Sequence, residues 1–179
     1  GLRPIGKVGQ NRDNQGLSEY DIAASASAIY QNDPVEMAAT GTITVAAATD
    51  TLLGSLNGVF FTDANTSKPT YANHLDASNA ATDIVGFVSD DPYERFEIQS
   101  DGALTAAEVG MNADIVYAAG SSPNYVSKVE LDHSDLKTAT AQLRVIGISK
   151  DPSNNEAGAA DVNAVVIINE HFLKGTVGV

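Results

Sequence analysis

The chain has 179 residues with no cysteine, and its 10 basic and 23 acidic residues give a formal charge of −13. The missing thiols exclude disulfides, thiolate metal sites and cysteine nucleophiles, and the negative charge argues against nucleic-acid binding. The length suits one domain, which at this size buries roughly 70% of its unfolded surface. No stretch approaches the ~18 consecutive apolar residues of a membrane helix. We therefore expect one folded body, with neither nucleic acid nor a membrane as a partner.

The first 18 residues differ from the rest of the chain in composition and charge. Residues 1–18 are rich in Gly, Asn and Gln and lack a sustained apolar period, which predicts an extended N-terminal arm. Residues 1–12 carry three basic and no acidic residues, so their charge is +3, and the remaining seven basic and twenty-three acidic residues give −16. A basic arm can dock on an acidic protein surface, and a frayed, solvated terminus is the alternative. The candidate contact residues of this arm are Arg3, Pro4, Lys7 and Arg12.

The next segments alternate between apolar and polar residues and predict strands. From Tyr20 to Tyr30 the apolar residues fall on every second position, which favours one long strand over an Ala-rich helix. Further strands, separated by Gly, Pro, Asn or Asp turns, are predicted at 35–37, 41–47, 56–61 and around Tyr71. The rest of 62–82 is a predicted polar loop, a place where β-domains often meet partners.

The segment 85–102 holds two alternating runs around Asp90-Asp91-Pro92, which predict a β-hairpin or a strand–turn–strand unit. Thr105 and Glu108 fit a capping box, so one short helix is expected there. Later strands are predicted at 111–118, 125–131, 142–149 and 164–172.

The last two predicted strands are almost continuously β-branched, which suits a sheet buried on both sides or a subunit contact. The candidate oligomer-interface residues are therefore Val165, Ile167, His171 and Phe172. Nine or ten strands with almost no helix predict an all-β domain over residues 19–179, a single β-barrel or β-sandwich.

The histidines give little support for catalysis or metal binding. None of His74, His133 and His171 has a second histidine at ligand spacing. His133 lies in the acidic loop 132–135, where a metal or catalytic role is the alternative to a solvated loop histidine. No Gly-x-Ser-x-Gly frame supports a hydrolase. We predict no catalytic, cofactor or metal residues.

Two acidic clusters are candidate chemical sites. One loop contains the oxygen donors Asp151, Asn154, Asn155, Glu156 and Asp161. Their spacing differs from that of an EF-hand, so a polar turn is favoured over a calcium site. The other group, Asp90, Asp91, Glu94 and Glu97, offers paired carboxylates of the kind that glycosidases use. Adjacent acids at a turn usually face water, which favours a structural interpretation.

Several motifs together resemble the head decoration, or cement, proteins of tailed phages, including cyanophages. The resemblance covers about residues 20–171, and its most specific part is 90–102 (DDPYERFEIQSDG). The other motifs are 29–35 (IYQNDPV), 41–45 (GTITV), 53–63 (LGSLNGVFFTD), 141–145 (AQLRV) and 166–171 (VIINEH).

The resemblance implies a small β-barrel, β-tulip-like protein that sits outside the expanded capsid and clamps adjacent capsomers. It implies the major capsid protein as partner, a homo-oligomer (a trimer in many phages, with a dimer as alternative), and no cofactor. The implied location is the outer surface of the virion head, after assembly in the host cytoplasm. A receptor- or glycan-binding module is the alternative function, although tryptophan, frequent in such sites, is absent. A β-rich hydrolase ranks third.

Overall fold

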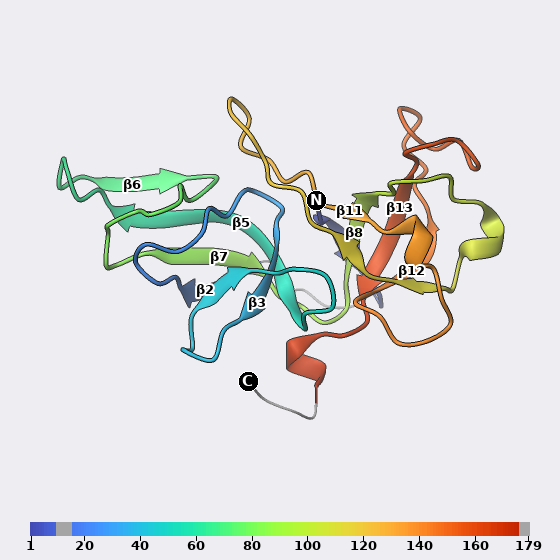
Figure 1. Ribbon diagram of the computed structural model, residues 1–179, viewed down its shortest axis with the longest axis horizontal. Helices are drawn as coiled ribbons and strands as arrows, with labels where there is room; N and C mark the ends of the chain where they lie inside the picture. The colour runs from blue at the N-terminus through green and yellow to red at the C-terminus, as the bar shows by residue number, and fades with distance from the viewer. Residues whose placement is uncertain (10–15, 176–179) are drawn as a thin grey trace.

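The computed structural model describes residues 1–9 and 16–175, and over these ranges the protein is all-β, as the alternating patterns predicted. Its strands form two open sheets and one short pair, and the helical segments described are three single 3₁₀ turns. The two sheets lie side by side and give the molecule two lobes (Figure 1). Within the described ranges neither sheet closes into a barrel. No helix among these residues is long and apolar enough to cross a membrane.

Sheet 1 is antiparallel, with the order β1-β8-β13-β12-β9. Its strands are β1 (Arg3–Lys7), β8 (Glu94–Gln99), β13 (Asn163–Ile168), β12 (Leu143–Ile148) and β9 (Asn112–Ala113). The lobe built on sheet 1 is called lobe 1, and the lobe built on sheet 2 is called lobe 2. Lobe 1 also contains β10 (Ile115–Val116), β11 (Glu130–Leu131) and the 3₁₀ turns η1 (Ala106–Glu108) and η2 (His133–Asp135). The predicted capping box is present, because Thr105 Oγ1 accepts a hydrogen bond from the Ala107 N–H and Glu108 accepts one from the Thr105 N–H.

Sheet 2 has the order β2-β7-β5-β3-β4, with β6 added to β5. Its strands are β2 (Ser18–Asp21), β7 (Val85–Ser89), β5 (Leu52–Thr62), β3 (Pro34–Met37), β4 (Ile43–Val45) and β6 (Pro69–Ala72). The last turn, η3 (Phe172–Lys174), follows β13, and its Phe172 packs against the core of lobe 2. The long strand β5 lies at the centre of sheet 2.

Each lobe has its own hydrophobic core. Core 1 is lined by the inner residues of sheet 1, such as Phe96, Val145 and Val166. Core 2 is lined by the inner residues of sheet 2 and the loops over them, such as Ile29 and Val59. Both cores consist mainly of Val, Ile, Leu and Ala.

The segment 85–102 is a strand–turn–strand unit and not a hairpin. Strand β7 pairs in sheet 2 and β8 pairs in sheet 1, so Asp90-Asp91-Pro92 carries the chain from one lobe to the other. The two acids at this crossing have partners in different lobes. Asp90 accepts a hydrogen bond from Tyr20 Oη at 2.6 Å, and Asp91 pairs with Lys7 Nζ at 2.9 Å. The acidic pair therefore has a structural role at the junction.

Of the predicted arm, residues 1–9 and 16–18 are described, and residues 1–9 are built into the body. Leu2 is fully buried in core 1, and Arg3–Lys7 forms β1 on the edge of sheet 1 beside β8. The Leu2 N–H donates to the Asn32 carbonyl at 2.9 Å, and its carbonyl accepts from Ser55 Oγ at 2.6 Å. The low apolar content of residues 1–9 did not predict that they belong to the folded body. One buried leucine and one strand partner are enough to hold the segment.

Several other predicted strands are shorter in the structure, and two of them contain a residue with a positive φ. The strand expected from Tyr20 to Tyr30 ends at Asp21, and Ser25, at φ 60°, turns the chain out of the extended conformation. The strand expected over 125–131 is limited to Glu130–Leu131. Tyr125, the first residue of that predicted strand, has φ 52°, which is not an extended conformation. Alternating polarity alone did not reveal these left-handed positions.

Candidate functional site

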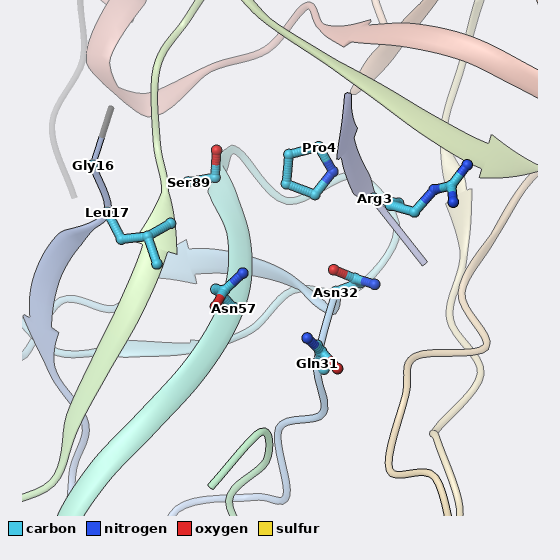
Figure 2. A pocket seen from close by; sticks show the side chains of 8 residues that line it. All are labelled: Arg3, Pro4, Gly16, Leu17, Gln31, Asn32, Asn57 and Ser89. Carbon is cyan, nitrogen blue, oxygen red and sulfur yellow. The ribbon is translucent and has the colours of Figure 1, made fainter. Parts of the chain in front are cut away.

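The candidate site is a groove of about 540 Å³ between the two lobes, beside the edge strand β1 (Figure 2). One wall comes from β1 in sheet 1, and the other from β5, β7 and the turn before β3 in sheet 2. The lining residues are Arg3, Pro4, Gly16, Leu17, Gln31, Asn32, Asn57 and Ser89. Three of these eight residues, Gln31, Asn32 and Asn57, carry amide side chains, and Arg3 is the one charged residue among them, so the groove combines hydrogen-bond donors and acceptors with apolar surface.

Strand β1 reaches the groove because it is an edge strand of sheet 1. Its one strand partner is β8, so its other edge is unpaired by any described strand. Pro4 suits this place, because proline cannot donate in a central ladder and is tolerated on an edge. Ile5, in the same strand, is 43% exposed. An unpaired edge is a place where a further extended segment can add to a sheet.

The opposite wall is shaped by two local irregularities. The register between β5 and β7 shifts between Leu56 and Gly58, which leaves Asn57 exposed at a bulge. Asn32 has φ 66°, a left-handed conformation that asparagine tolerates better than most residues. The Asn32 N–H donates to the Leu56 carbonyl at 2.7 Å while its own carbonyl accepts from Leu2. The Asn32 backbone therefore ties the two walls together.

The predicted contact cations Arg3 and Lys7 have acidic partners within the chain. Arg3, whose side chain is 54% exposed, pairs with Glu97 on β8. Glu97 is 8% exposed and also accepts hydrogen bonds from Ser149 Oγ at 2.8 Å and Asn163 Nδ2 at 3.0 Å. Lys7 pairs with Asp91, and Arg12 lies outside the described residues. Arg3 and Pro4 line the groove, whereas Lys7 is held at the crossing between the lobes.

The predicted oligomer-interface residues separate into two places. Val165 and Ile167 lie half-buried on the outer face of sheet 1, since their neighbours Val166 and Ile168 point into core 1. His171 is 2% exposed, and its Nδ1 accepts a hydrogen bond from the Leu173 N–H at 3.1 Å. Phe172 is half-buried against core 2. The structure thus leaves Val165 and Ile167 on an outer face and places His171 inside the fold.

The other candidate groups are engaged in local structure. Asp151 accepts hydrogen bonds from the Ser153 N–H and hydroxyl, at 3.0 and 2.8 Å, which lowers the pKa of its carboxyl. Glu94 accepts from the Gly6 N–H, and burial raises its pKa. The His133 N–H donates to Asp101 at 2.7 Å. Over residues 1–9 and 16–175, no group of three or more His, Asp or Glu side chains is arranged to hold a metal ion.

The sequence interpretation missed the amides that line the groove. Gln31, Asn32 and Asn57 have no charge or periodicity that marks them as a set, and the chain brings them together through the Leu2 contacts. One local signal was present, because Asn57-Gly58 interrupts an apolar run and is typical of a bulge. No family model, curated protein or solved structure matches this chain.

Proposed function

We propose that this protein is a structural component of a phage virion that binds the outside of the expanded capsid and cements adjacent capsomers. The observation that carries the proposal is the groove beside the edge of β1 that no described strand pairs, with the amides Gln31, Asn32 and Asn57 in its lining. The resemblance of residues 90–102 and the other motifs to head decoration proteins supports the same function. The proposal assigns the protein no catalytic step and no cofactor.

The groove suits an extended polypeptide segment of the major capsid protein. An extended chain presents alternating N–H and C=O groups, which an unpaired strand edge and the amides Gln31, Asn32 and Asn57 can satisfy. Arg3, already paired with Glu97, adds a partly exposed guanidinium at one end of the groove. This recognition depends on backbone shape more than on charge, so the acidic body does not prevent it.

The cementing effect follows from mass action. A protein that binds only the expanded shell stabilises that state by an amount that grows with its free concentration relative to its dissociation constant. Contacts repeated over a symmetric lattice then add up across the whole particle. The proposed place of action is the outer surface of the head, reached after synthesis in the host cytoplasm.

Binding of purified protein to expanded heads that lack it tests the role of the groove. The Asn57→Arg variant places a long side chain in the groove at an exposed bulge, so it should weaken binding by roughly tenfold or more. Asn155→Arg, at an exposed position in the 151–161 loop, makes the same change away from the groove and should bind like the wild type. Equal binding by both variants would remove the groove from the capsid contact.

A further inference from the structure

The outer faces of the two sheets carry unpaired charges of opposite sign around apolar centres. The basic face, on sheet 1, consists of Arg95, Arg144, Val165 and Ile167. The aromatic face, on sheet 2, consists of Phe60, Tyr71, Phe87, Glu19 and Asp21. The chain as a whole has a formal charge of −13. Two arginines beside half-buried aliphatic residues are therefore a local region of positive charge on an acidic protein. Neither face is used by the groove described above.

The basic face is built by strand register. Ile167 on β13 lies opposite Arg95 on β8 and Arg144 on β12, and directly opposed residues of antiparallel strands share a face. Among the described residues neither arginine forms an ion pair. Arg144 Nε donates to Asn112 Oδ1 at 2.9 Å, and Arg95 Nε is buried with no hydrogen-bond partner. The same register places Glu97 opposite Val165, but Glu97 is 8% exposed and is paired with Arg3. Among the described residues the two positive charges beside Ile167 therefore have no carboxylate paired with them.

The aromatic face is built in the same way. Tyr71 on β6 lies opposite Phe60 on β5, with ring centroids 4.7 Å apart, and the Phe87 ring is 6.4 Å from that of Tyr71. Tyr71 is 75% exposed, the largest value among the exposed large hydrophobic residues described. Glu19 lies opposite Phe87, and Asp21 two residues further along the same strand. Both acids are exposed, and neither pairs with a cation of the described chain.

We propose that the basic face of one copy docks on the aromatic face of a second copy. Arginine pairs with carboxylates through its fork of N–H donors and stacks on aromatic rings, so Arg95 and Arg144 match both groups of the aromatic face. Ile167 and Val165 meet the rings at the centre, where protein interfaces are enriched in aromatic residues. Two bodies of charge −13 repel each other in general, which makes such local complementarity necessary for association.

The contact joins two different surfaces, and it is heterologous when the two faces of one copy meet different neighbours. Each copy uses one face toward one neighbour and the other face toward the next, and such a contact forms a closed ring or an open line. The contact would explain how copies of the protein join on a phage head. Its place in the virion rests on the proposed function. Its test takes place in solution without capsid, so failure here leaves capsid binding by the groove untouched.

Sedimentation velocity on charge-reversal variants tests the contact. Glu19→Arg and Arg144→Glu each place like charges across it, so each should raise the dissociation constant of self-association at least about tenfold. The double variant Glu19→Arg/Arg144→Glu restores opposite charges with the signs exchanged and should associate again. The matched controls Glu156→Arg and Lys128→Glu change exposed residues outside both faces and should behave like the wild type.

Three results would overturn the inference. One is a wild-type protein that stays monomeric from about 1 μM to about 1 mM. Another is a double variant that associates no better than the single variants. The third is an effect of Arg144→Glu without any effect of Glu19→Arg, which would indicate a contact between two basic faces. Tyr71-dependent binding of a neutral oligosaccharide by a monomeric wild type would assign the aromatic face to glycans instead.

Discussion

Leu52 and Leu53 are neighbours in β5, yet their side chains lie in different hydrophobic cores. Leu52 packs in core 1 and Leu53 in core 2, and both are fully buried. Successive residues of a strand point to opposite faces, so one strand can belong to both lobes. The lobes are therefore joined by a shared strand as well as by the chain crossing at Asp90-Asp91-Pro92.

This shared strand predicts that the two cores unfold together. Leu52→Ala and Leu53→Ala should each lower the free energy of unfolding by roughly 2–5 kcal/mol, as for other buried leucines. Denaturant unfolding followed by far-UV circular dichroism and by tyrosine fluorescence should give one coincident transition for the wild type and both variants. Two separated transitions would show that the lobes are independent.

Glycine at position 54 is required by the close approach of β5 and β7. A Cβ at Gly54 would clash with the Ser89 carbonyl oxygen, a backbone atom that cannot move aside alone. Gly54→Ala should therefore cost roughly 1–3 kcal/mol of stability. Gly147→Ala is the matched control, because nothing lies within 4 Å of its added Cβ and the residue has no positive φ. Equal midpoints of thermal unfolding for the two variants would contradict this packing.

The buried Leu2 predicts that the first strand contributes to stability. Leu2→Ala should lower the free energy of unfolding by roughly 2–5 kcal/mol. Leu17→Ala, at a residue that is 41% exposed, should stay within about 0.5 kcal/mol of the wild type. If the segment were a separable arm, both variants would unfold at the same urea concentration as the wild type.

His171 predicts a specific pH dependence. Burial and the nearby Lys174 lower its pKa from 6.5 to about 4 in the folded protein. The folded pKa lies below the unfolded one, so the unfolded state binds more protons, and the contribution of His171 is complete above pH 6.5 and lost as pH falls toward 4.

The substitution His171→Asn isolates this effect, because asparagine keeps a side-chain acceptor but does not titrate. The difference in unfolding free energy between wild type and variant should shrink as pH falls from 6.5 toward 4. The comparison is needed because burial raises the pKa of Asp33, Glu36 and Glu94, and these acids change stability with the opposite sign. A difference that is constant with pH would mean that His171 binds protons equally in the folded and unfolded states.

The sequence predicted the strands better than their partners. Alternation in 85–89 and 94–99 marks β7 and β8 correctly, because period-two polarity records which residues are buried. The polarity pattern does not show in which sheet each strand pairs. A crossing between lobes and a hairpin therefore have the same pattern in the sequence. Leu52 and Leu53 show the same limit, since two adjacent apolar residues give no sign that they belong to two cores.

The candidate site was predicted only in part. Arg3 and Pro4 belong to the basic arm that was predicted to meet a partner, and they line the groove. Gln31, Asn32 and Asn57 were not expected, because they are brought together by the bulge in β5 and by hydrogen bonds to Leu2. Contacts of this kind are long-range and leave no local pattern in the chain.

The most direct test of the proposed function is the copy number of this polypeptide in purified virions, measured by quantitative mass spectrometry against the major capsid protein. A cement protein should be present at a ratio near one, or at another ratio that matches a set of symmetry positions of the capsid lattice. A few copies per particle would place the protein on a tail or a receptor-binding device, and its absence from virions would contradict the structural role altogether.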